Sequence, residues 1–154
     1  MTNNKREIDL IFMREALKVA QVAYFYQEVP VGALIVFKNE IIARAHNRKE
    51  ELQDSTAHAE MLAIQKASQY FRSWHLENTT LYVTLEPCPM CAYAILQARI
   101  KRLVFGTVDP KAGAVGSIIN IAQDKRFNHQ VEVESGILEE ECRIILQKFF
   151  QEKR

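Results

Sequence analysis

The sequence predicts an α/β fold in which helices pack on the faces of a sheet. Apolar segments with helical periodicity alternate along the chain with short segments rich in β-branched residues. The elements follow one another in the order α-β-β-α-β-α-β-β-α, an alternation typical of sheets covered by helices. No linker rich in Gly, Ser or Pro divides the 154 residues. We therefore expect residues 1–154 to form a single domain.

The first elements predict a helix and a hairpin. Apolar residues recur at helical spacing over residues 8–25, which indicates an amphipathic helix. The segments 31–37 and 41–45 are short and favour β structure, and the polar residues between them are typical of a turn. These two strands should therefore pair with each other.

The second helix should follow a polar loop. Residues 47–55 are polar and predict that loop, and a helix is expected over residues 58–69. Asp54, Ser55 and Thr56 are all residue types that cap helices. We expect one of them to begin this helix.

The later elements alternate between strands and helices. Residues 80–84 predict a strand, and Pro89 suits the first turn of a helix because its missing N–H is not needed there. That helix continues through Ala92, Ile95 and Leu96. The remaining elements are a strand at 102–107, a loop at 109–117, a strand at 131–133 and a helix at 137–151.

The composition is that of a globular protein. Hydrophobic residues make up 48% and charged residues 25% of the chain, and the net charge of +1 does not by itself indicate binding to nucleic acid. No apolar run is long enough to span a bilayer, and the first seven residues lack the apolar stretch of a secretory signal. The three cysteines form no disulfide framework. We expect a cytoplasmic protein that does not associate with membranes.

Two segments carry residues with metal-binding chemistry. His58 lies 30 positions before Cys88, which forms a Cys-x-x-Cys pair with Cys91. Structural zinc sites usually have four protein ligands, whereas a catalytic zinc site has three and leaves the fourth position to water. Glu60, two residues after His58, is the natural carrier of protons for that water. Both segments fall at expected helix starts, where the positive ends of helix dipoles stabilise thiolates.

Each of these residues also has an ordinary structural interpretation. Taken alone, His58 could cap a helix or pack in the core, and Glu60 could be a surface carboxylate. The two cysteines could be buried thiols or a redox pair. A redox pair would leave His58 and Glu60 without a role, so we prefer the metal interpretation, which explains all four residues. Cys142 has no Cys or His at ligand spacing and is expected to be a packed thiol.

The arrangement His-x-Glu followed by Pro-Cys-x-x-Cys resembles the signature of the zinc-dependent nucleobase deaminases. Nearly the whole chain resembles one branch of these enzymes, the bacterial tRNA-specific adenosine deaminases. The Asp-x-Lys-x-Gly-Ala-x-Gly-Ser loop and the Phe-Phe pair narrow the resemblance to this branch. The matching segments are 28–33, 46–48, 56–60, 84–91, 105–106, 109–117, 127–129 and 149–150.

The resemblance implies a cytidine-deaminase-like fold, with three α/β/α layers around a central five-stranded mixed sheet. It also implies a homodimer with one Zn²⁺ per subunit, held by His58, Cys88 and Cys91, and with Glu60 as the catalytic proton carrier. The implied reaction converts adenosine to inosine at the wobble position of an arginine tRNA, in its anticodon stem-loop. A zinc-activated hydroxide would attack C6, and ammonia would leave.

The resemblance further implies four substrate-binding residues. Asn47 matches a residue that holds the purine edge, a task that suits an amide, and Ala59 lies in the motif that contains His58. Asp109 matches a loop residue near the ribose, where a carboxylate can accept a hydrogen bond from the 2′-OH. Phe149 could pack against a splayed base. From the residues alone, Asn47 and Asp109 could also be turn residues, and Phe149 could belong to the core.

Two other functions are compatible with parts of this pattern. The same metal site could deaminate a free base or a nucleotide, such as cytosine, guanine or deoxycytidylate, because the metal motif does not specify RNA. A non-catalytic RNA-binding subunit could keep the zinc, but such a protein is expected to have lost the proton carrier. Glu60 is present. We therefore expect an enzyme, and the resemblance implies that its substrate is tRNA.

Overall fold

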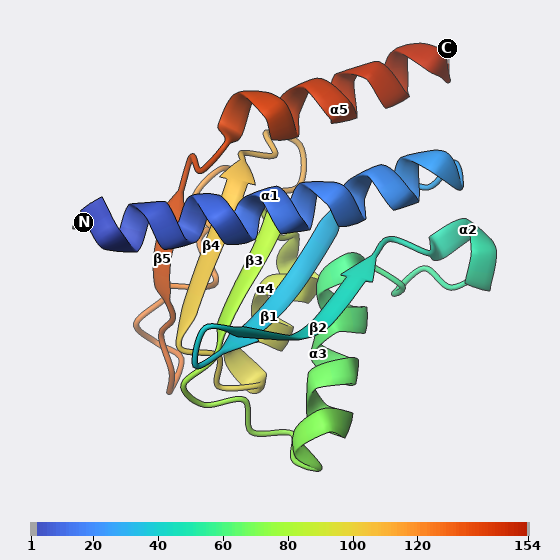
Figure 1. Ribbon diagram of the computed structural model, residues 1–154. Coiled ribbons are helices and arrows are strands. Elements are labelled where there is room, and N and C mark those ends of the chain that lie inside the picture. The colour runs from blue at the N-terminus through green and yellow to red at the C-terminus, as the bar shows by residue number, and fades with distance from the viewer. Residues whose placement is uncertain (1–2, 154) are drawn as a thin grey trace.

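A computed structural model describes residues 3–153, which form three α/β/α layers around one five-stranded mixed sheet (Figure 1). The expected fold class is confirmed. The first two residues and the last residue of the expected 1–154 domain lie outside the described part. The strands are β1 (Gly32–Phe37), β2 (Glu40–His46), β3 (Thr80–Leu85), β4 (Arg102–Thr107) and β5 (Glu132–Ser135).

The helices form the two outer layers. One face of the sheet is covered by α1 (Asn3–Phe25) and α5 (Glu139–Glu152), and the other by α3 (Ala59–Phe71) and α4 (Pro89–Gln97) (Figure 1). A single helical turn, α2 (Lys49–Leu52), lies between β2 and α3. Within residues 3–153, none of these helices combines the length and the apolar character needed to cross a membrane.

The direction of the strands brings several loops to one edge of the sheet. The strand order is β2-β1-β3-β4-β5, and β1 is antiparallel to both β2 and β3, whereas β4 is parallel to β3 and β5. Consequently β2, β3 and β4 run in the same direction, and their C-terminal ends lie at one edge. Ligands of open α/β sheets bind beyond the carboxyl ends of the strands.

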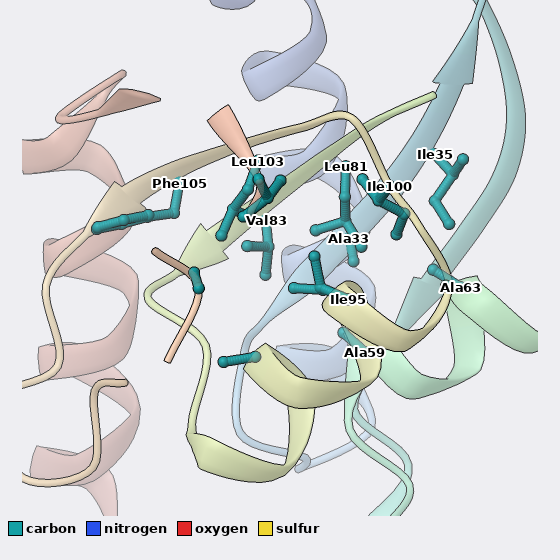
Figure 2. Close-up of a cluster of buried hydrophobic side chains, with 14 of the residues drawn as sticks. Ala33, Ile35, Ala59, Ala63, Leu81, Val83, Ile95, Ile100, Leu103 and Phe105 are labelled. Atoms are coloured by element: carbon teal, nitrogen blue, oxygen red, sulfur yellow. The ribbon is translucent and has the colours of Figure 1, made fainter. Parts of the chain in front are cut away.

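The central strands are buried on both faces, which explains their continuous apolar sequences. Successive side chains of a strand point to opposite faces of the sheet. Ala33 and Ile35 of β1 therefore pack in the cluster under α3 and α4 (Figure 2), whereas Leu34 and Val36 pack in the cluster under α1.

Small residues allow the helices to approach the sheet closely. Ala59, Ala63 and Ala67 are spaced four apart and form the buried face of α3. On the other side, a Cβ atom at Gly32 would collide with the backbone carbonyl of Ala16 in α1. The short distance between α1 and β1 thus requires glycine at this position.

A buried ionic network joins α1 to the sheet. The Arg102 guanidinium donates two hydrogen bonds to the carboxylate of Asp9, each 2.7 Å long, and the Tyr82 hydroxyl donates a third. Asp9 is fully buried, although the apolar spacing of its helix gives no sign of a buried acid. The pair satisfies both charges, as burial of ions requires.

The expected loop over 47–55 is wrong in one respect, because it contains the helical turn α2. The buried carboxylate of Glu28 accepts hydrogen bonds from the backbone N–H groups of Glu50 and Glu51, at 3.1 and 2.8 Å. These N–H groups belong to the first turn of α2, and the N–H groups of a first turn have no hydrogen-bond acceptor within their own helix. A residue more than 20 positions away therefore stabilises this turn.

Several element boundaries also differ from the expected ones by one to five residues. The first helix begins at Asn3 rather than residue 8, and the last covers Glu139–Glu152 rather than 137–151. The final strand is β5 rather than residues 131–133. Polar residues of β5 pair with β4 in parallel register at the edge of the sheet, where an apolar pattern is not required.

Candidate metal centre and active site

The sequence-predicted metal ligands lie at the N-terminal ends of two neighbouring helices. His58 occupies the N-cap position of α3, and Cys88 occupies that of α4. Cys91 lies in the first turn of α4, which Pro89 begins. Because α3 and α4 cover the same face of the sheet, their N-terminal ends bring the three side chains together.

The spacing of the three ligand atoms fits a zinc ion. Nδ1 of His58 lies 3.6 Å from Sγ of Cys88 and 3.5 Å from Sγ of Cys91. All three ligand atoms lie within 4.8 Å of one another. Zinc bonds of about 2.3 Å to sulfur and about 2.0–2.1 Å to nitrogen place tetrahedral ligands about 3.6 Å apart. The donor set and its geometry therefore agree with a tetrahedral zinc site.

The surroundings favour a thiolate at Cys88. A hydrogen bond from the Cys91 thiol lowers the pKa of Cys88 to about 4, and the His58 ring and the backbone N–H of Cys91 act in the same direction. Thiolates, not thiols, bind metals, and a helix N-terminus stabilises them further. The site is thus prepared electrostatically for a cation.

The carboxyl group of Glu60 is buried beside these ligands. Burial raises the pKa of Glu60 to about 7. The charge of Cys88 also raises this pKa, whereas the charge of His58 and a hydrogen bond with Cys91 lower it. A carboxyl group whose charged form is disfavoured by burial holds protons more readily than one in water.

Asn47 connects the end of β2 to the start of α3. Its Oδ1 atom accepts a hydrogen bond of 2.8 Å from the backbone N–H of Ala59. This contact replaces the expected cap, because neither Asp54 nor its neighbours bond to the first turn of α3 among the described residues. Since Oδ1 faces Ala59, the NH₂ group is the part of the amide that can meet a substrate. Ala59 itself is fully buried.

A second buried carboxylate organises the loop that follows β4. Glu86 accepts hydrogen bonds from the backbone N–H groups of Asp109, Val115 and Ser117, at 3.0, 2.9 and 3.1 Å, and from the Ser117 hydroxyl. Burial raises its pKa, but these bonds lower it more, so the net pKa is below the usual 4.5. At Gly113, a Cβ atom would collide with this carboxyl group.

Glu86 was not among the sequence-predicted site residues, nor was Glu28. Both lie in segments of the resemblance, but their partners are distant in the sequence. A single charged residue between an apolar strand and Pro-Cys is the signal that could have identified Glu86.

Asp109 lies at the same edge as the metal ligands, but its observed contacts belong to its own turn. Oδ1 accepts hydrogen bonds from the backbone N–H groups of Lys111 and Ala112, at 3.0 and 3.2 Å. Such contacts are typical of a turn-initiating Asp. The predicted role of Asp109 in binding the ribose stays a prediction.

Phe149 lies in α5, on the face of the sheet opposite α3 and α4 (Figure 1). Its ring is 7% exposed and packs edge-to-face on Tyr24 of α1, with the ring centroids 6.1 Å apart. Phe150 is 48% exposed. The described contacts of Phe149 are those of a packed residue, and its contact with a base stays a prediction.

Comparisons with known proteins identify similar chains over almost the full length. A family model described as MafB19-like deaminase matches residues 7–154. The tRNA-specific adenosine deaminase of Bacillus subtilis (strain 168) is 54% identical over 146 residues, which cover 95% of this chain and 91% of the relative. That of Aquifex aeolicus (strain VF5) is 48% identical over 143 residues, covering 93% and 94%.

A solved structure shows the same similarity in three dimensions. It comes from a study of A-to-I editing by tRNA:A34 deaminases at the wobble position of transfer RNA. The two structures match with a TM-score of 0.85 and 46% sequence identity, over 88% of this chain and 98% of the other.

The cysteines should differ in their effect on bound zinc. We expect Cys88→Ser to lose most of its zinc, because a hydroxyl is a weak ligand for this metal. Cys142→Ala should keep the zinc content of the unchanged protein, because Cys142 lies on the buried side of α5, on the other face of the sheet from α3 and α4. Mass spectrometry of metals in the purified proteins measures this. Equal zinc in the two variants would contradict the assigned ligand set.

Replacement of Glu86 by Gln should loosen residues 109–117. The NH₂ group of Gln would face backbone donors and leave some of them unpaired, at a cost of about 2 kcal/mol in the free energy of unfolding. Amide hydrogen exchange of the loop should increase, and urea unfolding gives the free energy. Because the folded-state pKa of Glu86 is lowered, its stabilisation is complete at neutral pH and is lost as the pH falls through that pKa. The free energies of unfolding of the unchanged protein and of Glu86→Gln should therefore become more similar in acid. A difference that does not change with pH would count against the role of Glu86 as an anchor for the loop.

Proposed function

The chain belongs to the tRNA-specific adenosine deaminases, and on this premise we propose that it converts adenosine to inosine at the wobble position of tRNA. One observation carries the proposal. His58, Cys88 and Cys91 present three ligand atoms to a common point, with the buried carboxyl group of Glu60 beside them. Three ligands and one adjacent carboxyl group are the set that hydrolytic deamination needs.

We assign one zinc ion per subunit to these three ligands. When bound in such a site, zinc acts as a Lewis acid and lowers the pKa of water towards about 7. Glu60 accepts a proton from the attacking water and delivers one to a ring nitrogen of adenine, which makes C6 more electrophilic. It then takes the proton of the hydroxyl group added at C6 and passes it to the amine, which leaves as ammonia while C6 becomes a carbonyl carbon. Because Glu60 is buried, it exchanges protons with the substrate rather than with bulk water.

Four residues are proposed to bind the nucleoside. The NH₂ group of Asn47 donates to N7 of the adenine, since its oxygen is bonded to Ala59. Ala59 stands next to the ligand His58 at the base of this site. Asp109 accepts a hydrogen bond from the ribose 2′-OH through Oδ2, because its Oδ1 atom already accepts a hydrogen bond from the backbone of its own turn. Phe149 supports a splayed base from α5.

We further propose that the enzyme is a cytoplasmic homodimer that binds the anticodon stem-loop of an arginine tRNA. Support for the dimer comes from exposed aromatic rings on the α4 side of the molecule. Tyr93 and Phe127 are exposed and contact each other with ring centroids 5.4 Å apart. Exposed apolar clusters of this kind mark protein interfaces.

The decisive experiment is conversion of unmodified arginine tRNA by the zinc-loaded protein. Inosine is read as guanosine by reverse transcription, so sequencing should show an A-to-G change at the wobble position. Ammonia release from free bases and nucleotides should be measured in parallel. Turnover of one of these compounds with tRNA unchanged would refute the proposal and favour a small-molecule deaminase.

Glu60→Gln should separate zinc binding from catalysis. We expect normal zinc content, because Glu60 is not a ligand, and a loss of turnover of at least about 100-fold, because the proton carrier is absent. Glu77→Gln, at an exposed carboxylate that lies 3.3 Å from the ring of the surface residue His75, serves as the control and should react normally. Undiminished turnover by Glu60→Gln would disprove the role of Glu60.

A further inference from the structure

A groove lies beside the proposed active site, along the edge strand β2. It has a volume of about 800 Å³ and is lined by residues of β2, α2 and α3, by Val19 of α1, and by Tyr26 and Glu28, which follow α1. Figure 1 shows where these four elements lie. None of the three proposed metal ligands lines it. The proposed reaction therefore does not explain this groove.

Two aromatic rings face each other across the groove. The rings of Tyr26 and His46 are nearly parallel, with an angle of 10° between their planes and 6.4 Å between their centroids. Stacked bases are about 3.4 Å apart, so a base between two parallel rings needs about 7 Å. The gap between the two ring planes is at most the centroid distance of 6.4 Å, so a base enters only when Tyr26 moves outward. Tyr26 is 61% exposed and follows the end of α1, so its side chain has room to move outward.

The other wall of the groove is held in place. Nδ1 of His46 lies 2.8 Å from the backbone carbonyl of Asn47, to which it donates a hydrogen bond. The Asn47 side chain in turn accepts a hydrogen bond from the backbone N–H of Ala59, which follows the proposed ligand His58. The fixed ring thus belongs to the same short segment that connects β2 to the metal centre.

The charges around the groove do not favour an anion. Arg48 is paired with Glu51, at 2.5 Å, and the nearby carboxylate of Glu28 is bonded to α2. Three basic and three acidic side chains line the groove in total, namely Arg44, Arg48, Lys66, Glu28, Glu50 and Glu51. A phosphate would gain little from such a balanced set, whereas an uncharged planar ring would gain from the two aromatic faces.

We infer that Tyr26 and His46 form a stacking slot for a base that flanks the deaminated adenosine in the RNA. The inference rests on the proposed function, because an RNA substrate must place neighbouring bases close to the reacting one. Single-stranded RNA is commonly held by bases stacked on aromatic side chains. The slot would add affinity for RNA without taking part in the reaction.

Fluorescence of a base analogue tests the slot directly. The probe is an anticodon stem-loop RNA that carries 2-aminopurine immediately 5′ or 3′ of the target adenosine. The zinc-loaded full chain should quench one of the two probes, because stacking quenches 2-aminopurine. Tyr26→Ala should abolish this quenching and raise Kd and KM about tenfold, whereas Tyr26→Phe, which keeps the ring, should behave normally. The dependence of Kd on salt should not change, because no phosphate contact is removed.

Tyr70→Ala is the matched control. Tyr70 is also 61% exposed, lies on α3 and packs on Phe71, but it does not line the groove. The Tyr70→Ala variant should bind the RNA and quench the 2-aminopurine probe as the unchanged protein does. If the unchanged protein forms inosine but Tyr26→Ala binds and quenches equally well, the slot is refuted and the proposed function stands. If the unchanged protein forms no inosine in tRNA, the proposed function itself fails, and the slot fails with it.

Discussion

The hydrogen bond between Asn47 and Ala59 is the contact on which the candidate site depends. It joins the C-terminal end of β2 to the first turn of α3 and so fixes the position of His58. The contact is possible because β2 and β3 run in the same direction, which places the residues after both strands at one edge of the sheet. Cys88 follows β3 at that edge. Strand direction and one side-chain amide therefore decide where the ligands meet.

Two buried carboxyl groups near this edge behave in opposite ways for one physical reason. Glu60 lacks donors sufficient to offset burial, so its charged form is disfavoured and its pKa is raised. Glu86 receives three backbone N–H groups and a hydroxyl, which stabilise its charged form in spite of burial. The first arrangement suits a group that moves protons, and the second suits a permanent anchor for a loop.

The ligands and the order of the elements could be predicted because each depends on short-range patterns. Cys-x-x-Cys spacing, a Pro at a helix start and apolar periodicity are all local. The roles of Asp9, Glu28 and Glu86 could not be predicted, because their partners lie 22 to 93 positions away and the acids themselves look like ordinary surface residues. Strand β5 was displaced for a related reason, since pairing with β4 at an edge sets its limits and apolar periodicity does not.

The ion pair between Asp9 and Arg102 also constrains the order of events during synthesis of the protein. The two residues are 93 positions apart. Domains generally fold as units while the N-terminal part leaves the ribosome first. Helix α1 therefore emerges long before the strand that neutralises its buried acid. Asp9 is without its countercharge until β4 has left the exit tunnel. Helix α1 therefore reaches its final, buried position only after Arg102 has been synthesised.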